Sequence, residues 1–467
     1  MQLKRISLSL LMMGVSAVAS ASGYHFGSQS VSAQGTAHAN GAEAADASVL
    51  FYNPAGMSLL DGTNFSGGLT FVVPHSEFTN QGSTKVTGAA TTGGNGDSFA
   101  PSLVAAPSFY FTHQLNSKMH VGLGIFVPYG AQLDYGHSWA GRYALESIKL
   151  ETLNFNPSFS FKLDDRQSVG VGVSAQYMKA KLSKAVDVAG GFAILPGPTQ
   201  AAIIAGLGAH AANLGSTTDG QASLDADGWG FGANVGYMFK LDDNTRFGLA
   251  YRSNIHHKLT GSATWDYSMV NADPVIVATI QGLAKQLGHV SSGGSVSVDT
   301  PESVSANAFH KLNDKVDLMA DLTWTRHSRM KSIDIKFDQP GEGDLVIRQN
   351  WRDTYKLSLG MNYHYNDALT LRSGVAYDQS PVKDETLRHA ALPDSDRYWL
   401  SVGANYKLNK ASSLDFAYSY VMFKDAKMNY KDSCNPDATT CTGNGETTKG
   451  TYKTNLQFLG VQYNYRF

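Results

Sequence analysis

Hydrophobic and polar residues alternate one by one along most of the chain after about residue 64. The pattern is clearest in three stretches, 169–177, 229–239 and 355–365. In each stretch one set of alternate residues is apolar and includes aromatic side chains, whereas the other set is small or polar. A period of two places these sets on opposite faces of a β-strand. Strands of this kind suit a barrel with lipid outside and a hydrated lumen inside.

Fourteen alternating segments follow one another, and their connections differ in length. The segments begin near residues 64, 101, 118, 147, 167, 221, 244, 294, 314, 345, 369, 396, 411 and 450. Every second connection is a short polar turn, and most of the others are long, as in 183–220 and 429–450. An even strand number with short turns at one end is typical of transmembrane barrels. We therefore predict an all-β fold, a 14-stranded antiparallel transmembrane β-barrel over residues 64–467. A secreted β-sandwich or solenoid would not need one continuously apolar strand face.

The N-terminal region does not alternate. Residues 1–21 begin with Lys4 and Arg5, continue with an apolar run and end in small residues, as a cleaved secretory signal peptide does. Residues 22–63 are small, polar and rich in Gly and Ala. Because a barrel of fourteen strands encloses more space than its own side chains fill, we predict that residues 22–63 form a plug in the lumen. The alternative is a disordered tail.

Composition narrows the range of functions. Only 16% of the 467 residues are charged and the formal net charge is −2, which argues against binding to nucleic acid. The chain has no long uninterrupted apolar run that would predict a helical membrane protein. No nucleotide-binding, metal-binding or nucleophile motif stands in a fitting context, so we predict neither an enzyme nor a cofactor.

Two cysteines, Cys434 and Cys441, lie in the last long loop, and an exported chain is expected to join them in a small disulfide.

Residues 47–57 contain Asn53, Pro54 and Ala55 in sequence. This stretch resembles the Asn-Pro-Ala hatch motif of the FadL family of outer-membrane transporters for long-chain fatty acids and other apolar compounds. Further stretches that look like the family are 228–232, 251–253, 378–382 and 393–401. The terminal Phe467 also resembles the ending by which outer-membrane barrels are passed to the barrel assembly machinery.

The resemblance implies passive uptake of long-chain fatty acids or other hydrophobic molecules across the bacterial outer membrane. In this scheme the solute is captured on extracellular loops, enters an inner pocket, and leaves sideways through the wall after the hatch has moved. The implied partners are the apolar solute, outer-membrane lipid, lipopolysaccharide and the barrel assembly machinery, and a monomer is expected. A general diffusion porin for hydrophilic solutes and a surface adhesin remain alternatives.

Four basic residues are candidates for binding a ligand carboxylate. Strand alternation places Arg252, Lys356 and Arg372 on the lumen face, and Arg372 is the preferred candidate. The resemblance adds Lys179, although family members carry arginine there and alternation points Lys179 outward. The alternative for each residue is an interior ion-pair lattice that stiffens the barrel and holds the plug.

Two further features concern the path of the solute. The long loops contain apolar stripes, including Ile203, Ile204, Leu207 and Leu214, which form either a capture groove or a self-packed lid. The resemblance assigns 128–146 and 183–220 to the outer groove. It also implies a kink in the third strand as the lateral exit. The residues that would interrupt the strand are Gly122, Gly124, Pro128 and Gly130.

Overall fold

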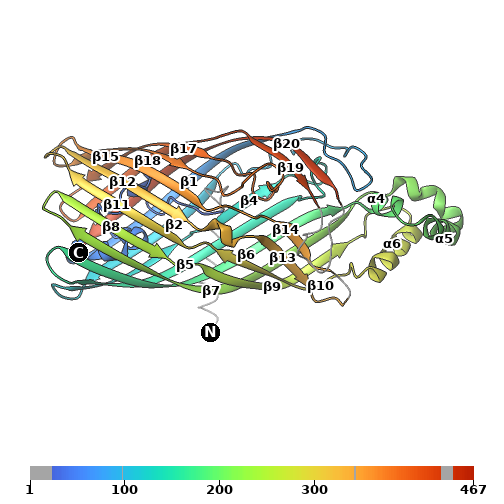
Figure 1. The fold of residues 1–467 in the computed structure, drawn as a ribbon, viewed down its shortest axis with the longest axis horizontal. Coiled ribbons are helices and arrows are strands. Elements are labelled where there is room, and N and C mark those ends of the chain that lie inside the picture. The colour runs from blue at the N-terminus through green and yellow to red at the C-terminus, as the bar shows by residue number, and fades with distance from the viewer. Residues whose placement is uncertain (1–23, 97, 341–342, 433–444) are drawn as a thin grey trace.

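A closed antiparallel β-barrel dominates the computed structural model, which describes residues 24–96, 98–340, 343–432 and 445–467 (Figure 1). Within these residues twenty strand segments make up fourteen barrel strands, as predicted. The unbroken strands are β1 (Thr63–Asn80), β2 (Val104–Gln114), β5 (Ser147–Lys162), β6 (Gln167–Val186), β7 (Gly220–Lys240), β16 (Leu369–Asp378), β17 (Arg397–Lys407) and β20 (Thr447–Arg466).

Six strands are each made of two segments. They are β3 (Met119–Phe126) with β4 (Gly130–Asp134), β8 (Thr245–Arg252) with β9 (Ile255–Asp266), β10 (Ser292–Thr300) with β11 (Ser303–Lys311), β12 (Val316–Thr325) with β13 (Ser332–Phe337), β14 (Leu345–Arg348) with β15 (Thr354–His364), and β18 (Ser412–Phe423) with β19 (Ala426–Lys431). Each strand begins close to its predicted start, and the largest differences are those between 101 and Val104 and between 450 and Thr447.

The barrel closes between its first and last strands. β1 pairs with β2 on one side and with β20 on the other, so that Gly67 lies opposite both Phe109 and Tyr463. Closure removes the free strand edges that would otherwise expose unpaired backbone groups. A backbone with no free edges can lie in hydrocarbon, because every peptide group has a partner within the protein.

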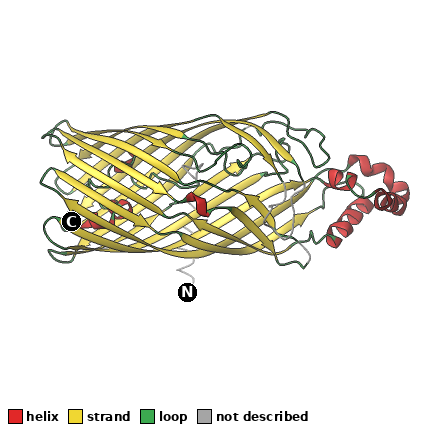
Figure 2. Ribbon diagram, viewed as in Figure 1, coloured by secondary structure: helices red, strands yellow, loops and turns green. Residues whose placement is uncertain are grey.

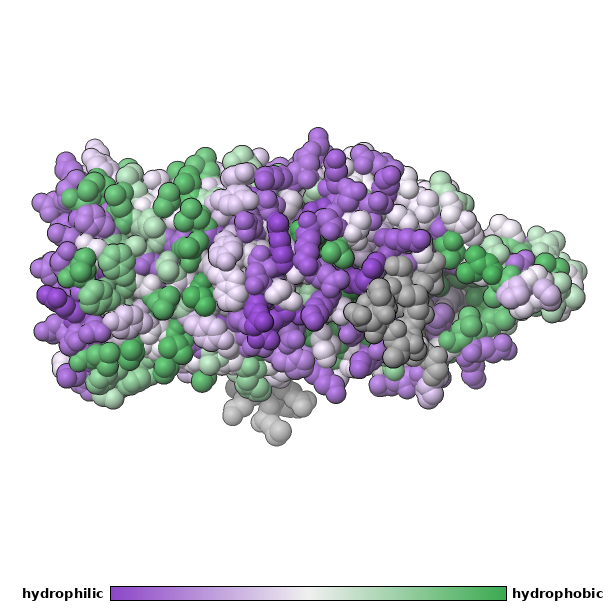
Figure 3. All heavy atoms as spheres, viewed as in Figure 1, coloured by the Kyte–Doolittle hydropathy of each residue, from purple (hydrophilic) through white to green (hydrophobic). Residues whose placement is uncertain are grey.

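The outer face of the strands near the short turns is apolar. Phe231 is 73% exposed, Val173 60% and Leu249 51%, whereas the residues between them point into the lumen. Figure 3 shows green side chains gathered over this half of the barrel and a purple band beyond it. An apolar surface of this extent indicates contact with lipid. In the described part of the chain no helix has the length and apolar character needed to cross a membrane.

The helices of the long loops project from the opposite end of the barrel (Figure 2). They are α4 (Val188–Ala193), α5 (Gly197–Leu207), η2 (Gly208–Ser216) and α6 (Pro274–Gln286). A short helical turn, η3 (His327–Arg329), instead lies in the barrel wall, between β12 and β13.

Residues 24–62 lie inside the barrel and are called the hatch below. Their helices are short: α2 (Val31–Gln34), α3 (Val49–Tyr52) and η1 (Pro54–Leu59). Most of these residues are buried, including polar ones such as Gln34 and Asn53. The predicted plug is therefore present in the lumen. The predicted signal peptide, residues 1–21, lies outside the described residues.

Candidate functional site

A cavity of about 140 Å³ lies between the hatch and the barrel wall. Hatch residues His25, His38, Phe51 and Tyr52 form one side of it. The wall contributes polar side chains from strands seven to eleven together with Tyr129 from strand three. These wall residues include Arg252, Ser303, Ser305, Asp321, Thr323, Thr325, His327, Thr354, Lys356 and Asp378. The cavity thus combines aromatic and polar surfaces.

Two of the predicted cations, Arg252 and Lys356, line this cavity together. Arg252 donates to the Phe51 carbonyl at 2.9 Å, and its guanidinium lies 4.8 Å from the centre of the Phe51 ring. Lys356 Nζ lies 2.6 Å from Nδ1 of His38 and 5.0 Å from the centre of the Trp399 ring. Neither side chain forms an ion pair with a carboxylate among the described residues. A buried cation that lacks an anionic partner favours the binding of an anion.

The tautomer of His38 follows from these contacts. An ammonium group can only donate a hydrogen bond, so Nδ1 of His38 accepts from Lys356. The imidazole proton is then on Nε2, which donates to the Ser28 hydroxyl at 2.9 Å.

Arg372, the preferred candidate by sequence, has a different role in the structure. Its guanidinium pairs with Asp415 at 3.2 Å and donates to the carbonyl of Ser32 in the hatch at 3.1 Å. Both charged side chains are almost fully buried, and Arg372 is not among the cavity residues. Strand alternation correctly gives the face of Arg372, but the paired arginine holds the hatch and is not free to bind a ligand carboxylate.

Lys179 lies on the outer face of β6, where alternation places it. It pairs with Asp225 at 3.5 Å on the neighbouring strand, and Lys181 pairs with the same carboxylate at 2.6 Å. There is no bulge in β6 that would turn Lys179 inward, since its register with β7 is continuous. The structure does not bring Lys179 to the cavity.

Strand three is interrupted beside the cavity. β3 ends at Phe126, β4 begins at Gly130, and Pro128 lies between them. The hatch hydrogen-bonds to this break: the Phe26 amide donates to the Pro128 carbonyl at 2.8 Å, and the Gly130 amide donates to the Tyr24 carbonyl at 2.9 Å. The start of the hatch therefore pairs with the backbone of strand three at the interruption.

The other two glycines of the predicted kink lie within the paired part of β3. A Cβ atom at Gly122 would be 2.5 Å from Leu50 Cδ1 and 2.7 Å from Met57 Sδ. At Gly124 it would be 3.1 Å from Leu50 Cδ2. These glycines make room for the apolar side of the hatch, and the interruption itself is at Pro128, which supplies no backbone N–H.

The Asn-Pro-Ala motif lies against the wall of strands five to seven. Asn53 donates from its amide to the Tyr237 carbonyl at 3.0 Å, and the Ser168 hydroxyl donates to the Ala55 carbonyl at 3.1 Å. A Cβ at Gly236 would lie 2.1 Å from Asn53 Oδ1, so the fit leaves no space for a side chain there. The motif is an anchoring point of the hatch.

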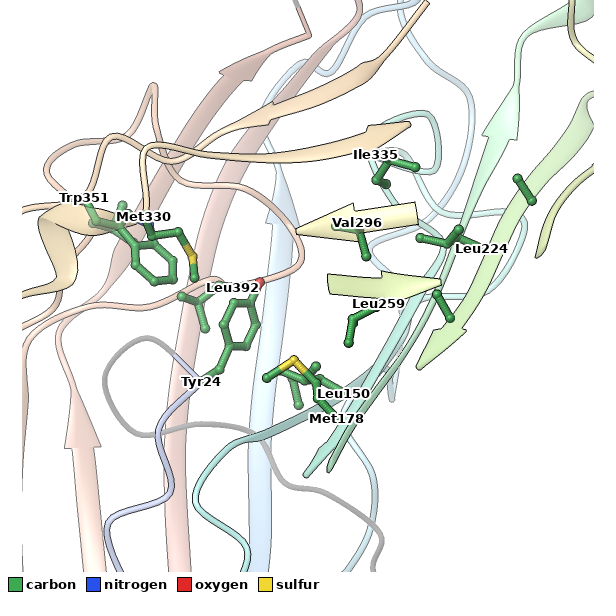
Figure 4. Packing of buried hydrophobic residues seen from close by; sticks show 14 residues of the cluster. Tyr24, Leu150, Met178, Leu224, Leu259, Val296, Met330, Ile335, Trp351 and Leu392 are labelled. Carbon is green, nitrogen blue, oxygen red and sulfur yellow. The ribbon is translucent and has the colours of Figure 1, made fainter. Parts of the chain in front are cut away.

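An apolar cluster lines the lumen on the loop side of the cavity (Figure 4). It includes Leu150, Met178, Leu224, Leu259, Val296 and Ile335 from the strands, and Tyr24, Met330, Trp351 and Leu392 from the hatch, wall and loops. Sequence analysis assigned the lumen face as small or polar and missed this cluster. The cluster could have been found from the inward-facing positions, which change from small or polar to apolar residues toward the loop ends of the strands.

The loop helices are partly exposed and partly packed against each other. Leu207 is 4% exposed, Ile204 is 44% exposed, and Ile203 and Leu214 are half-buried. His210 and Asn213 both hydrogen-bond to the Asp273 carboxylate, at 2.8 and 2.7 Å, and so lower the pKa of Asp273 to about 2. Both alternatives weighed for these helices, a capture surface and a lid, therefore have a physical basis.

A second loop contact is sensitive to pH. His137 Nδ1 lies 2.9 Å from the Glu146 carboxylate, which also accepts a hydrogen bond from Gln221 at 2.8 Å. The hydrogen bond to Glu146 raises the pKa of His137.

The predicted disulfide between Cys434 and Cys441 lies outside the described residues. Among the described residues no group of His, Cys, Asp or Glu side chains is arranged to hold a metal ion.

Comparison with known proteins gives one consistent result. Residues 12–467 match the family model described as "Outer membrane protein transport protein (OMPP1/FadL/TodX)". A relative in Neisseria meningitidis serogroup B, an outer membrane protein by name, is 34% identical over 98% of this chain and 98% of the relative. The long-chain fatty acid transport protein of Escherichia coli O6:H1 is 30% identical over 89% of this chain and 90% of its own length.

A solved structure has the same architecture. The crystal structure of a Pseudomonas aeruginosa FadL homologue superposes with a TM-score of 0.81 and covers 97% of this chain and 100% of that one. At 23% sequence identity this likeness supports the fold, that is, the fourteen-stranded barrel with an internal hatch.

Proposed function

The chain belongs to the OMPP1/FadL/TodX family of outer membrane transport proteins, and we propose that it takes up long-chain fatty acids, passively, across the bacterial outer membrane. Its location in the outer membrane and its role in transport of hydrophobic substrates, without catalysis, follow from the family. The proposal concerns the substrate and the route. The similarity to an E. coli protein named for long-chain fatty acid transport supports it.

One observation carries the choice of a fatty acid. Two cations that form no ion pair with a carboxylate among the described residues, Arg252 and Lys356, line the same cavity, and an apolar cluster begins on its loop side. A fatty acid has the matching pattern, with one carboxylate at the end of a long apolar chain. Burial of its tail is favourable by about 0.8 kcal/mol for each methylene group, or about 12 kcal/mol for fifteen. The carboxylate needs a cation, since a buried unpaired charge is costly.

The proposed route has four stages. Exposed apolar side chains of the loop helices, such as Ile204, capture the tail. The apolar cluster then receives the tail and the cavity receives the carboxylate. Movement of the hatch at Tyr24 and Phe26 opens the break in strand three, and the solute leaves sideways into the membrane. This exit spares the tail a return to water.

Uptake by cells tests the proposal. A bacterial host that lacks its own long-chain fatty acid transporter should accumulate a radiolabelled C18 fatty acid when it expresses this chain, and not when it carries the empty vector. Protein purified in mild detergent should also retain bound fatty acid that mass spectrometry detects. If the cells accumulate no labelled fatty acid and the purified protein retains none, the proposal that fatty acids are the substrate is refuted.

Conductance separates this function from the porin alternative. The hatch fills the lumen through buried contacts, so the protein in planar bilayers should pass little steady current. A large steady conductance for small ions would instead indicate a general diffusion pore.

A further inference from the structure

Four neighbouring strands are interrupted at one level of the barrel wall. β8 ends at Arg252, β11 begins at Ser303, β12 ends at Thr325 and β15 begins at Thr354. These four residues form one row of hydrogen-bonded partners, because Ser303 pairs with both Arg252 and Thr325, and Thr325 pairs with Thr354. Beyond this row all four strands stop before they resume as β9, β10, β13 and β14.

The interruption is widest between strands eight and nine. On the loop side of Ser303 the ladder resumes only at Ser297, which pairs with Asp334. Residues 298–302 and 326–333 are therefore not paired with each other across this gap, although 298–300 still pair with β9 and 332–333 with β14. Residues 326–331 instead fold back as η3 and its flanks, and the Arg326 amide donates to the Glu302 carbonyl at 2.9 Å. Figure 2 shows η3 as a short red helix set into the near wall.

The proposed ligand cavity reaches this interruption from inside. Pro301, Ser303, Thr325 and His327 all line the cavity, and they lie within or directly beside the two segments that do not pair with each other. The carboxylate site proposed above and the interruption therefore share a wall.

Ion pairs close the interruption from outside. The Glu302 carboxylate binds Arg326 at 3.1 Å and also binds Arg329. Glu302 itself is nearly buried, whereas the two arginine side chains are 49% and 36% exposed. One carboxylate thus holds two guanidinium groups that face the surroundings of the barrel. We name these three side chains the latch.

The latch lies at the edge of the apolar outer surface. In the next row toward the short turns, Tyr251 is 43% exposed and Tyr355 is 52% exposed. Exposed tyrosines of this kind mark the interface between lipid and water in membrane barrels. In Figure 3 a purple band follows the green region on this face of the barrel. The latch is therefore level with the headgroups of the outer leaflet.

The inner side of the interruption contacts the hatch. Met330 packs with Trp351 in the apolar cluster, and the ring of Trp351 lies 6.0 Å from that of Tyr24 (Figure 4). The Tyr24 carbonyl also accepts the hydrogen bond from Gly130 at the break in strand three. The first residue of the described hatch thus touches both interruptions of the wall.

We propose that the interruption between strands eight and nine is a second lateral portal, which admits single-chain anionic amphiphiles from the outer leaflet directly to the cavity. The inference rests on the proposed function. The carboxylate of an incoming amphiphile replaces Glu302 on Arg326 and Arg329, residues 326–331 move outward, and the headgroup passes between Pro301 and His327. The tail remains in lipid until the apolar cluster receives it.

A reversible crosslink tests the portal. The backbone hydrogen bond between Arg326 and Glu302 places their Cα atoms about 5 Å apart, as in other antiparallel neighbours, within reach of a disulfide. In the Glu302→Cys/Arg326→Cys variant, oxidation should slow uptake of a labelled fatty acid from the outer leaflet of vesicles at least fivefold, and reductant should restore it. The matched control is Ser297→Cys/Asp334→Cys, which joins residues that are already paired, and its oxidation should leave the rate unchanged.

The outcomes separate the portal from the transport function itself. Unchanged uptake with a complete crosslink between residues 302 and 326 would overturn the portal, whereas absence of uptake by the unmodified chain would overturn the proposed function. Folding of each variant is checked by the heat-dependent shift of barrel mobility on gels. A Glu302→Gln variant provides a second test without cysteines. It weakens the latch and should raise the initial rate at least twofold, and an unchanged or lower rate would contradict the portal.

Discussion

Replacement of Lys356 by methionine tests the carboxylate site most directly. Methionine keeps most of the unbranched apolar stem and removes the ammonium group that lies 2.6 Å from His38 and lines the cavity. Lys356 has no ion-pair partner within salt-bridge distance among the described residues, so its loss breaks no salt bridge. The change therefore acts on an anionic ligand more than on the fold.

The expected effect follows from the energy of one charge-assisted hydrogen bond. Such a bond contributes roughly 1.5–3 kcal/mol, and each 1.4 kcal/mol is a factor of about ten in affinity. Lys356→Met should therefore weaken binding of a C18 fatty acid roughly 10- to 150-fold. The fatty alcohol of the same length carries no charge and buries the same tail, so its affinity should change by less than about threefold. Arg252→Met should show the same selectivity.

Displacement of a fluorescent fatty acid from detergent-purified protein measures both affinities. Lys179→Met is the matched control, since Lys179 lies on the outer face and should affect neither ligand. The assignment would be refuted if Lys356→Met weakened the acid and the alcohol equally, or if Lys179→Met had an effect of the same size.

Three further predictions concern the hatch and a loop. Arg372→Met leaves the buried Asp415 without its cation and should cost on the order of 3 kcal/mol, seen as a lower urea midpoint, with the preference for acid over alcohol retained. Gly236→Val places a Cβ 2.1 Å from an amide oxygen of the hatch, so it should displace the hatch and raise the steady conductance in planar bilayers. The pKa of His137 is raised by its hydrogen bond to Glu146, so this contact stabilises the loop fully below about pH 6.5 and is lost as the pH rises through the raised value. Proteolysis of this loop should therefore accelerate at alkaline pH relative to a His137→Gln variant.

The sequence was sufficient to predict the barrel because a lipid-facing strand allows little choice of residue. Every second side chain must be apolar, and a shift by one residue would expose the wrong face. The strand starts are therefore close to the predicted ones even where the strands are later interrupted. The hatch was predictable from the same reasoning, since residues before Thr63 lack alternation and the lumen is wide.

The candidate cations could be placed on a face but not distinguished from one another. Alternation puts Arg252, Lys356 and Arg372 inside, and the structure has all three there. Which of them is paired depends on residues that are distant in sequence. Asp415 meets Arg372 across the one intervening strand, β17, whereas Lys356 meets His38 of the hatch. No local pattern carries that information.

The interruptions of the strands could likewise be predicted only in part from the sequence. Pro128 can be recognised in the sequence as a residue that interrupts strand pairing, because proline has no backbone N–H. Pro301 can be recognised in the same way. The breaks in strands nine and ten contain no such residue: 326–331 and 349–353 include neither Gly nor Pro. Each break instead holds one residue, Met330 or Trp351, that packs in the apolar cluster together with Tyr24 of the hatch. A feature that arises from tertiary contacts cannot be found from the period of one strand.

The hydrogen-bond partners of Arg252 and Lys356 explain how a ligand could move the hatch. Lys356 is held by His38 and Arg252 by the Phe51 carbonyl, and both acceptors belong to the hatch. A carboxylate that binds the same N–H donors takes hydrogen bonds away from the hatch. Binding is then favoured in the state in which the hatch has released them, and a ligand shifts a conformational equilibrium only by such a difference in affinity. An uncharged hydrophobic molecule can fill the apolar cluster but cannot compete for these hydrogen bonds, so charge recognition and hatch movement depend on the same atoms.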